Sequence, residues 1–278
     1  MKRFSLEPEK LLKCFGVAKT NYIELGEKKH AEQIPILYED RSVIAIDKPP
    51  WWMLVPFSWQ KTNRNLQAAI TSSIGAGSFW ARSRNVKFLQ HIHRLDAETT
   101  GILLFGKSPG AVRTFGELFE SRQMEKVYLA AVEGVPKNAE WNCDLSIAPD
   151  SNEIGKMKVD ARNGKEAETF FKVVETRENK TLVEAHPVSG RTHQIRVHLA
   201  HTGHPVLGDP LYGTPLKPME GKRQANLQFP IGLRAVQLSY LDPFTKQRVR
   251  IQAPTEGFVR EFNFKSWNAR TSPTAKMS

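Results

Sequence analysis

The chain is poor in cysteine, has no long uninterrupted apolar sequence and has no excess of glycine or proline. Its two cysteines, Cys14 and Cys143, are too few for a disulfide framework and too isolated for structural zinc, which predicts a reducing, cytoplasmic location. With 18 glycines, 17 prolines and 40% hydrophobic residues, the composition excludes collagen-like and disordered chains. No run approaches the roughly 18 apolar residues of a membrane helix, and residues 1–10 lack a secretory signal, so we expect neither membrane insertion nor export.

Positive charge is what the chain has in excess. Lysine and arginine outnumber aspartate and glutamate by 40 to 29, giving a formal net charge of +11. Such a surface attracts nucleic acid because neutralised phosphates release condensed counterions, although solubility or anionic membranes would also account for the charge. Residues 1–35 are rich in lysine and have few apolar positions, so we expect a basic N-terminal extension that contains one short helix and is too short for a complete RNA-binding domain.

The remaining pattern predicts one domain over residues 36–265 and a flexible tail over 266–278. Strand pairs are predicted at 36–46, 169–185 and 234–252, single strands at 102–105 and 127–132, and helices at 66–74 and 109–122. Ser108 and Pro109 supply the N-cap and first position of the second helix. Because hairpins outnumber βαβ units, we expect an α+β fold with a mixed, largely antiparallel central sheet flanked by helices.

Two segments concentrate polar residues that are capable of chemistry. In residues 91–107, HIHRLDAETTGILLFGK, a charged cluster stands directly before an apolar strand. Asp96 there is either a surface partner of Arg94 or a carboxylate at the mouth of a cleft. Residues 186–213 hold several histidines and arginines, and the stretch 191–199 fits a strand or a helix that Gly203 ends.

The histidines also permit a metal-dependent hydrolase. We disfavour a metal site because no His-Glu-x-x-His or Cys-x-x-Cys motif appears, and because Arg94, Arg191 and Arg196 stand among the potential ligands, where they would oppose a cation.

Four motifs together resemble the RluA-type family of RNA pseudouridine synthases. They are Asp47-Lys48-Pro49, the stretch from His93 to Leu104, Glu125-Lys126-Val127-Tyr128 and the stretch from Gly190 to His198, within a resemblance over roughly residues 36–255. The resemblance implies an enzyme that converts uridine in RNA, either rRNA or tRNA, to pseudouridine. It also implies an active-site cleft across the sheet, and a monomer that uses no metal and no other cofactor.

The resemblance assigns roles to particular residues. Asp96 would be the catalytic carboxylate, as nucleophile or as acid and base, and Arg196 would pair with it. Tyr128 would stack on the flipped base and assist in removing its carbon-five proton, and Arg94 would enter the RNA stack as the uridine leaves. Arg191, Lys48 and His93 are further RNA-binding candidates, although Arg191 would also serve to brace the site and Lys48 to hold a loop.

The chain departs from the family pattern after Lys48-Pro49. Pro50 and Trp51 stand where the family has a small residue and glycine, so a different turn is expected. Tryptophans at 51, 52, 59 and 141 either stack on unpaired bases or pack on the body, and we favour packing. An RNA-binding or ribosome-assembly factor that has the fold without catalysis is the main rival to the enzyme.

Overall fold

The computed structural model of the chain describes residues 20–26, 31–54, 64–214 and 227–267. Its helices are α1 (Leu66–Gly75), α2 (Phe79–Arg82), α3 (Pro109–Glu120), α4 (Gln194–His201) and α5 (Glu256–Glu261). Its strands are β1 (Tyr22–Leu25), β2 (Glu32–Glu39), β3 (Val43–Lys48), β4 (Gln90–His91), β5 (Thr100–Gly106), β6 (Glu125–Glu133), β7 (Glu140–Cys143), β8 (Ile147–Pro149), β9 (Met157–Val159), β10 (Thr169–Arg177), β11 (Lys180–Pro187), β12 (Leu233–Leu241) and β13 (Arg248–Gln252).

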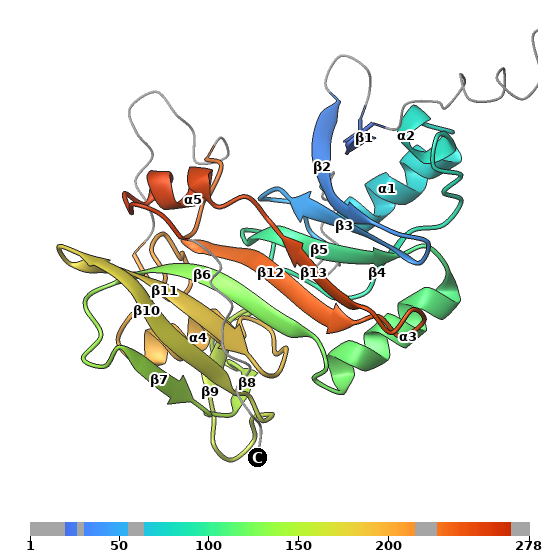
Figure 1. Ribbon diagram of the computed structural model, residues 1–278. Helices are drawn as coiled ribbons and strands as arrows, with labels where there is room; N and C mark the ends of the chain where they lie inside the picture. The colour runs from blue at the N-terminus through green and yellow to red at the C-terminus, as the bar shows by residue number, and fades with distance from the viewer. Residues whose placement is uncertain (1–19, 27–30, 55–63, 215–226, 268–278) are drawn as a thin grey trace, which may run out of the picture.

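One large mixed sheet organises the molecule (Figure 1). Its strands follow the order β1-β2-β3-β5-β12-β6-β11-β10-β7, with β4 paired to β5 and β13 paired to β12, while β8 and β9 form a separate hairpin. All strand pairs in the described part of the chain are antiparallel except β5 with β12. The predicted α+β fold with a largely antiparallel sheet is confirmed.

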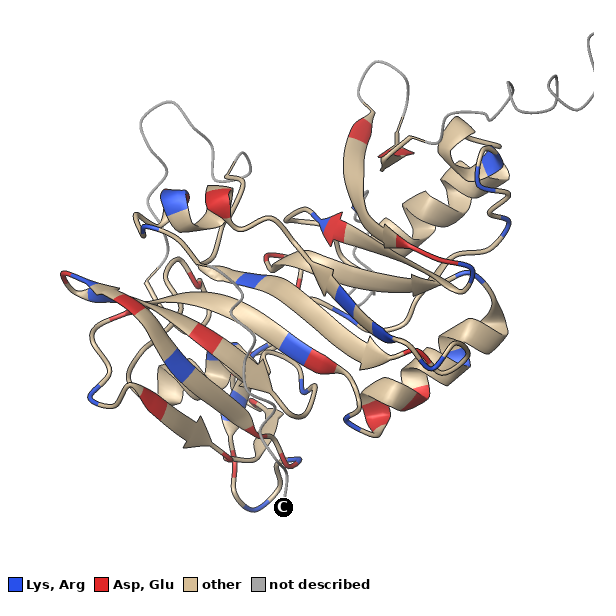
Figure 2. Ribbon diagram, in the orientation of Figure 1, with Lys and Arg blue, Asp and Glu red and all other residues tan. Residues whose placement is uncertain are grey.

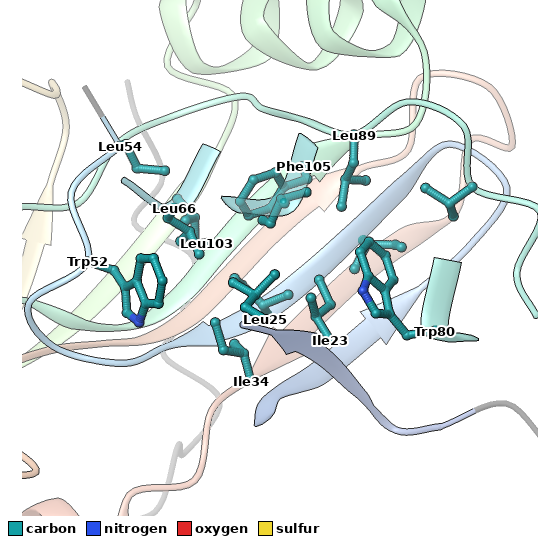
Figure 3. Packing of buried hydrophobic residues seen from close by; sticks show 14 of the residues in the cluster. Ile23, Leu25, Ile34, Trp52, Leu54, Leu66, Trp80, Leu89, Leu103 and Phe105 are labelled. Carbon is teal, nitrogen blue, oxygen red and sulfur yellow. The ribbon is translucent and has the colours of Figure 1, made fainter. Parts of the chain in front are cut away.

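Alternation along the strands gives the sheet two apolar faces. In β3, Ile44 and Ile46 face a cluster that includes residues of α1 and α2, whereas Val43 and Ala45 face a cluster that includes α3. Figure 3 shows the first cluster, in which Leu66 of α1 and Trp80 of α2 meet side chains of the strands. Helices therefore cover both faces of this half of the sheet.

The other half of the sheet is covered in the same way. Ile195 and Leu199 of α4 pack with alternate residues of β6 and β11, and Phe258 of α5 packs on the opposite alternation. Tyr128 of β6 contacts both the α1 and the α4 clusters, so these two helices share one face of the sheet. The junction between the two clusters on this face is where polar side chains gather.

Most of the predicted elements are present. Ser108 caps α3 by accepting a hydrogen bond from the Ala111 N–H at 3.1 Å, and Pro109 is the first helical residue. The three predicted strand pairs correspond to β2 with β3, β10 with β11 and β12 with β13. The ambiguous stretch at 191–199 contains the helix α4, which is followed by Gly203 with φ of 85°. The helix alternative is therefore confirmed.

The predicted start of the folded domain at residue 36 is wrong. Strand β1 pairs with β2, and Ile23, Leu25 and Ile34 are buried in the cluster shown in Figure 3. The alternation of apolar residues in this short stretch was too weak to predict a strand, because lysines surround it in the sequence. The helix predicted in the extension, if it lies within residues 1–19, is outside the described residues.

The flexible tail predicted over residues 266–278 also includes a residue that belongs to the folded domain. Trp267, which lies inside the range 266–278, packs with Phe264 and α5, whereas residues 268–278 are outside the described part. No helix in the described ranges is long and apolar enough to cross a membrane.

The parallel contact between β5 and β12 requires a glycine. Gly101 pairs with Ala235 and has φ of 108°, a conformation that L side chains rarely adopt. A Cβ at position 101 would lie 2.1 Å from the Ala235 carbonyl oxygen, which belongs to the backbone and cannot move aside alone. Gly101 thus lets β12 lie close beside β5. This strand directly follows the loop that carries Asp96, called the Asp96 loop below.

Gly101→Ala is expected to destabilise the protein by about 2–4 kcal/mol, because it combines backbone strain with a backbone clash. Gly116→Ala is the matched control, since a Cβ on Gly116 of α3 meets nothing within 4 Å and alanine favours a helix. Urea unfolding measures both. Equal free energies of unfolding for the two variants would contradict this account of the β5–β12 contact.

Candidate active site

A pocket of about 630 Å³ lies at the junction of the two halves of the sheet. It brings together the loop before β5, the end of α3, β6 and the segment that leads into α4. Its lining includes the predicted site residues His93, Arg94, Asp96, Tyr128, Arg191 and Arg196. Lys48 does not line it. Residues from positions 93 to 196 thus meet in one place, as the predicted cleft across the sheet requires.

An ion-paired carboxylate occupies the pocket. Arg196 Nη1 donates to Asp96 Oδ2 at 3.1 Å, which confirms the predicted pair and corrects the alternative in which Asp96 pairs with Arg94. The Arg196 side chain is 1% exposed, whereas that of Asp96 is 23% exposed. A buried guanidinium therefore holds and orients a carboxylate that still reaches the pocket.

A second carboxylate fixes Arg196 from behind. Asp209 is fully buried, and its two oxygens accept from Arg196 Nε at 2.6 Å and Nη2 at 2.8 Å. Backbone N–H groups of Leu211 and Tyr212 also donate to Asp209. Burial alone would lower the pKa of Arg196, but the hydrogen bonds and charge of Asp209 together with Asp96 raise it, so the guanidinium stays charged.

Asp209 lies in the segment 186–213, but its sequence context assigns it no role. The signal was weak, because one aspartate after a glycine resembles an ordinary turn residue. What distinguishes Asp209 is its bidentate contact with a residue 13 positions earlier, and only the fold brings the two together.

Tyr128 faces the same pocket from the central strand β6. Burial raises the pKa of its phenol above the ordinary value, and the neighbouring Asp96 charge raises it further. The side chain is therefore a neutral phenol at neutral pH and presents an apolar ring beside the Asp96 carboxylate.

Lys48 holds the Asp96 loop instead of lining the pocket. Its side chain is fully buried, and Nζ donates to the carbonyl oxygens of Pro49 at 3.0 Å, Ala97 at 3.0 Å and Thr99 at 2.9 Å. Because Nζ is buried and faces three backbone carbonyl oxygens, it presents no donor to a phosphate in the pocket. The predicted contact of Lys48 with RNA is corrected to the loop-holding alternative.

Trp51 holds the same loop through its backbone. Its N–H donates to Ala97 O at 2.7 Å, and its φ of 67° lies in the left-handed region that glycine adopts freely. That this turn differs from the turn of the family stays a prediction. Trp52 is buried with the Arg64 guanidinium 4.8 Å from its ring, and Trp141 stacks on Phe171, so these two pack as favoured. Trp59 lies outside the described residues.

Lys48→Met tests the buried ammonium. Burial lowers the pKa of Lys48 to about 7, against the attraction of Asp96 and Glu98. Between about pH 7 and the ordinary lysine value near 10.4, the unfolded chain therefore binds more protons at this site than the folded chain. Stability of the native protein should rise with pH over this window and fall as pH drops toward 7.

Urea unfolding of the native protein and Lys48→Met at several pH values measures this slope. The difference between them isolates Lys48 from other groups, and it should change by up to about 4 kcal/mol across the window. Parallel pH profiles would contradict the prediction and would mean that Lys48 stays charged in the fold.

His93 packs beside the pocket and carries no charge there. Its ring stacks on Phe119 with centroids 4.6 Å apart, and Nε2 accepts the Leu104 N–H at 3.1 Å. Burial lowers its pKa to about 3. The ring therefore ties the loop to β5 and supplies no cation, and the contact of His93 with RNA stays a prediction.

The pocket lining contains basic residues besides Arg196. Arg94 and Arg191 are both exposed, and their side chains donate to Thr192 Oγ1 at 3.4 Å and to Glu166 O at 2.8 Å. Arg122 and Lys126 extend the basic lining toward α3. Elsewhere acidic and basic positions are interspersed over the sheet and its hairpins (Figure 2). The pocket therefore offers several cations to a polyanion.

The histidines serve separate local contacts. His198 lies between Thr169 Oγ1 and Leu145 O, His204 faces Glu133 O, and His186 faces Glu184. No group of three or more potential ligands gathers among the residues with defined positions. Nothing in this geometry favours the metal-dependent hydrolase.

The sequence also matches a family model. Residues 69–201, which include Asp96, Tyr128 and Arg196, match the model described as RNA pseudouridylate synthase. Ribosomal large subunit pseudouridine synthase C of Vibrio cholerae is 35% identical over 250 residues, which are 87% of this chain and 71% of that protein. The chain belongs to the RNA pseudouridylate synthase family. This confirms the family that the four motifs predicted.

Other relatives place the family match in context. A protein of the same name from Yersinia pestis is 38% identical over 181 residues, which are 63% of this chain and 54% of that protein. The chain thus spans about half the length of that curated relative. The solved structure of human RNA Pseudouridylate Synthase Domain Containing 4 has a TM-score of 0.64 and 26% identity over 84% of this chain and 94% of that one.

Proposed function

We propose that the protein is an RNA pseudouridine synthase that isomerises uridine in RNA, with Asp96 as its catalytic carboxylate. The observation that carries the proposal is the partly exposed Asp96 carboxylate at 3.1 Å from the buried Arg196, in a pocket that also contains Tyr128. The volume of about 630 Å³ suits one nucleoside with its flanking phosphates, since small-ligand sites span about 300–1,000 Å³.

The reaction needs no co-reactant. The bond between uracil N1 and ribose C1′ breaks, a bond between uracil C5 and C1′ forms, and the proton leaves C5 and ends on N1. Asp96 acts on the sugar either as a nucleophile or as acid and base, and both roles begin from the anion that Arg196 holds and orients. Asp209 keeps the guanidinium in place without taking part in the chemistry.

Tyr128 supports a stacked base. Its ring belongs to the strand that forms one wall of the pocket, and its raised pKa keeps the hydroxyl protonated. A neutral phenol is a weak base, so this favours the stacking role over removal of the C5 proton. We therefore propose that Tyr128 contacts the uracil ring mainly through its aromatic face.

Arg94 suits the task of replacing an extruded base. Its side chain is exposed beside Asp96, and its hydrogen bond to Thr192 at 3.4 Å is long and easily exchanged. A uridine in a helix hides its sugar carbon until the nucleotide is flipped out, which leaves a gap in the stack. The planar guanidinium of Arg94 is able to fill that gap and stack on the neighbouring bases.

The RNA partner is proposed from the relatives and from charge. The matched bacterial proteins are named for the ribosomal large subunit, and another Vibrio cholerae relative is named a dual-specificity RNA pseudouridine synthase. Arg94, Arg122, Lys126 and Arg191 line the pocket where RNA phosphates would approach. We propose rRNA or tRNA as the substrate, and a cytoplasmic monomer as the active form.

Asp96→Asn is expected to lower the isomerisation rate by at least about 10³-fold, since the amide lacks the charge that the reaction uses. Its size is unchanged, so RNA affinity should stay within about threefold, because phosphate contacts dominate binding. Pseudouridine mapping of RNA from cells with the native gene, with the variant or without the gene measures activity and identifies the target uridine. Glu117→Gln, which changes an exposed carboxylate on α3, is the control and should retain full activity.

The two rival functions make different predictions for the same experiment. A fold that only binds RNA predicts identical pseudouridine maps with and without the gene, and full rescue of any growth defect by Asp96→Asn. Loss of pseudouridine at a defined position in the deletion strain, restored by Glu117→Gln but not by Asp96→Asn, supports the enzyme.

A further inference from the structure

The second oxygen of Asp96 faces a histidine. Asp96 Oδ2 accepts from Arg196, whereas Oδ1 accepts no hydrogen bond from any described residue. The nearest ring nitrogen is His193 Nε2, at 3.9 Å from Oδ1. This separation is too long for a hydrogen bond but short enough that a shift of about 1 Å would form one. His193 has no role in the function proposed above.

The hydroxyl of Tyr212 determines which nitrogen of His193 carries the proton. The Met157 N–H donates to the Tyr212 oxygen at 2.8 Å, and the same hydroxyl lies 2.9 Å from His193 Nδ1. Because the hydroxyl accepts from Met157, its own proton is free to be donated to Nδ1. A neutral imidazole that accepts at Nδ1 carries its proton at Nε2. That proton then faces Asp96 Oδ1.

His193 occupies a strained backbone position to reach this place. It is the residue before α4 and has φ of 55° and ψ of 17°, in the left-handed region. A residue with a Cβ is held in this region only with conformational strain, and such strain persists where the surroundings impose it. His193 and Arg196 stand three residues apart at the start of α4, so both side chains reach the same carboxylate.

Burial keeps His193 neutral despite the acidic groups around it. Burial lowers its pKa, Asp96 acts to raise it, Arg196 acts to lower it, and Glu98 and Asp209 act to raise it, with a net lowering below the ordinary value. At neutral pH the ring is therefore an uncharged hydrogen-bond donor. It adds no positive charge to the site around Asp96.

We propose that His193 is a positioning residue of this site, whose Nε2–H donates to Asp96 Oδ1 when a nucleoside occupies the pocket, while Tyr212 fixes the required tautomer. The inference rests on the proposed function, since it gives the catalytic carboxylate its second partner. Catalytic hydrogen bonds are often long in a free enzyme and shorten in the substrate complex. With Arg196 on one oxygen and His193 on the other, the carboxylate has a single orientation toward the sugar.

Tyr212 links this arrangement to the rest of the site. Its ring lies edge-on to His193 at 5.7 Å and beneath the Arg196 guanidinium at 5.3 Å. Its own backbone N–H donates to Asp209. Both partners of Asp96 thus depend on the segment around residues 209–212, so removing the Tyr212 hydroxyl should disturb His193 while the ring still supports Arg196.

Nitrogen-15 NMR of the full chain tests the tautomer without any need for activity. In the native protein at neutral pH, His193 should be neutral with its proton on Nε2. In Tyr212→Phe, which keeps the ring and removes the hydroxyl, the proton should divide between Nδ1 and Nε2. An imidazolium or a proton fixed on Nδ1 in the native protein overturns the proposal.

Kinetics of RNA modification test the positioning role. His193→Phe should lower kcat by about 10–100-fold and leave KM within about threefold, as expected for a residue that orients a reacting group. His193→Gln restores an N–H donor near the Nε2 position and should recover most of kcat despite the same backbone strain. His201→Gln, at an exposed histidine on the same helix, is the control and should match the native rate.

The outcomes separate this inference from the proposed function. A native protein without activity on any uridine contradicts the proposed function, and the NMR result then decides the tautomer by itself. An active native protein with unchanged kcat in His193→Phe overturns the positioning role. Equal loss in His193→Phe and His193→Gln also overturns it, because a purely structural role would not depend on the donor. If His193→Phe fails to fold, the comparison of His193→Gln and Tyr212→Phe with the native protein decides.

Discussion

The buried guanidinium of Arg196 is the interaction on which the site depends. It lies between one fully buried carboxylate, Asp209, and one that reaches the pocket, Asp96. A buried arginine without partners would be very unfavourable, and two carboxylates compensate its charge at the cost of being held close together. This arrangement adds little net stability to a fold, but it gives each charged group a single position. The chemistry we propose needs position more than it needs stability.

Other polar contacts near the site fix the backbone of the loop that carries Asp96. Lys48 and the Trp51 backbone bind carbonyl oxygens of the loop that carries Asp96, and Gly101 lets that loop continue into a strand beside β12. Lys48 and Trp51 therefore fix the backbone of this loop, while Arg196 fixes the side chain of Asp96. A loop with both kinds of support keeps a reacting group oriented without help from the substrate.

Sequence patterns predicted the strands and helices where periodicity was strong, as in α3 with its Ser108 cap. They failed where tertiary contacts decide. The stretch 191–199 fitted a strand and a helix equally, because α4 is buried on most of its surface and so lacks the one-sided pattern of an exposed helix. Strand β1 was not predicted, because it lies in a lysine-rich segment and its two buried residues, Ile23 and Leu25, are too few to form a recognisable pattern.

The site was predictable in part, and for a definable reason. Asp96 and Arg196 belong to motifs, so the resemblance paired them although 100 residues separate them. Lys48 and His93 also belong to motifs, but a motif does not reveal which way a side chain points, and both contact the protein's own backbone. Asp209 and Tyr212 act through partners that only folding brings near, so a single sequence gives no basis for assigning them.

The position of β12 has a consequence for how the molecule is made. Strands β5 and β6 follow one another along the chain, yet β12 lies between them and pairs with both. A nascent chain that has emerged from the ribosome only as far as residue 232 therefore has two incomplete half-sheets. It lacks β12, the strand that joins them beside the pocket. Since domains fold as their parts leave the ribosome, the pocket is completed only after β12 has emerged, and truncation before residue 241 leaves β5 and β6 with exposed, unpaired edges.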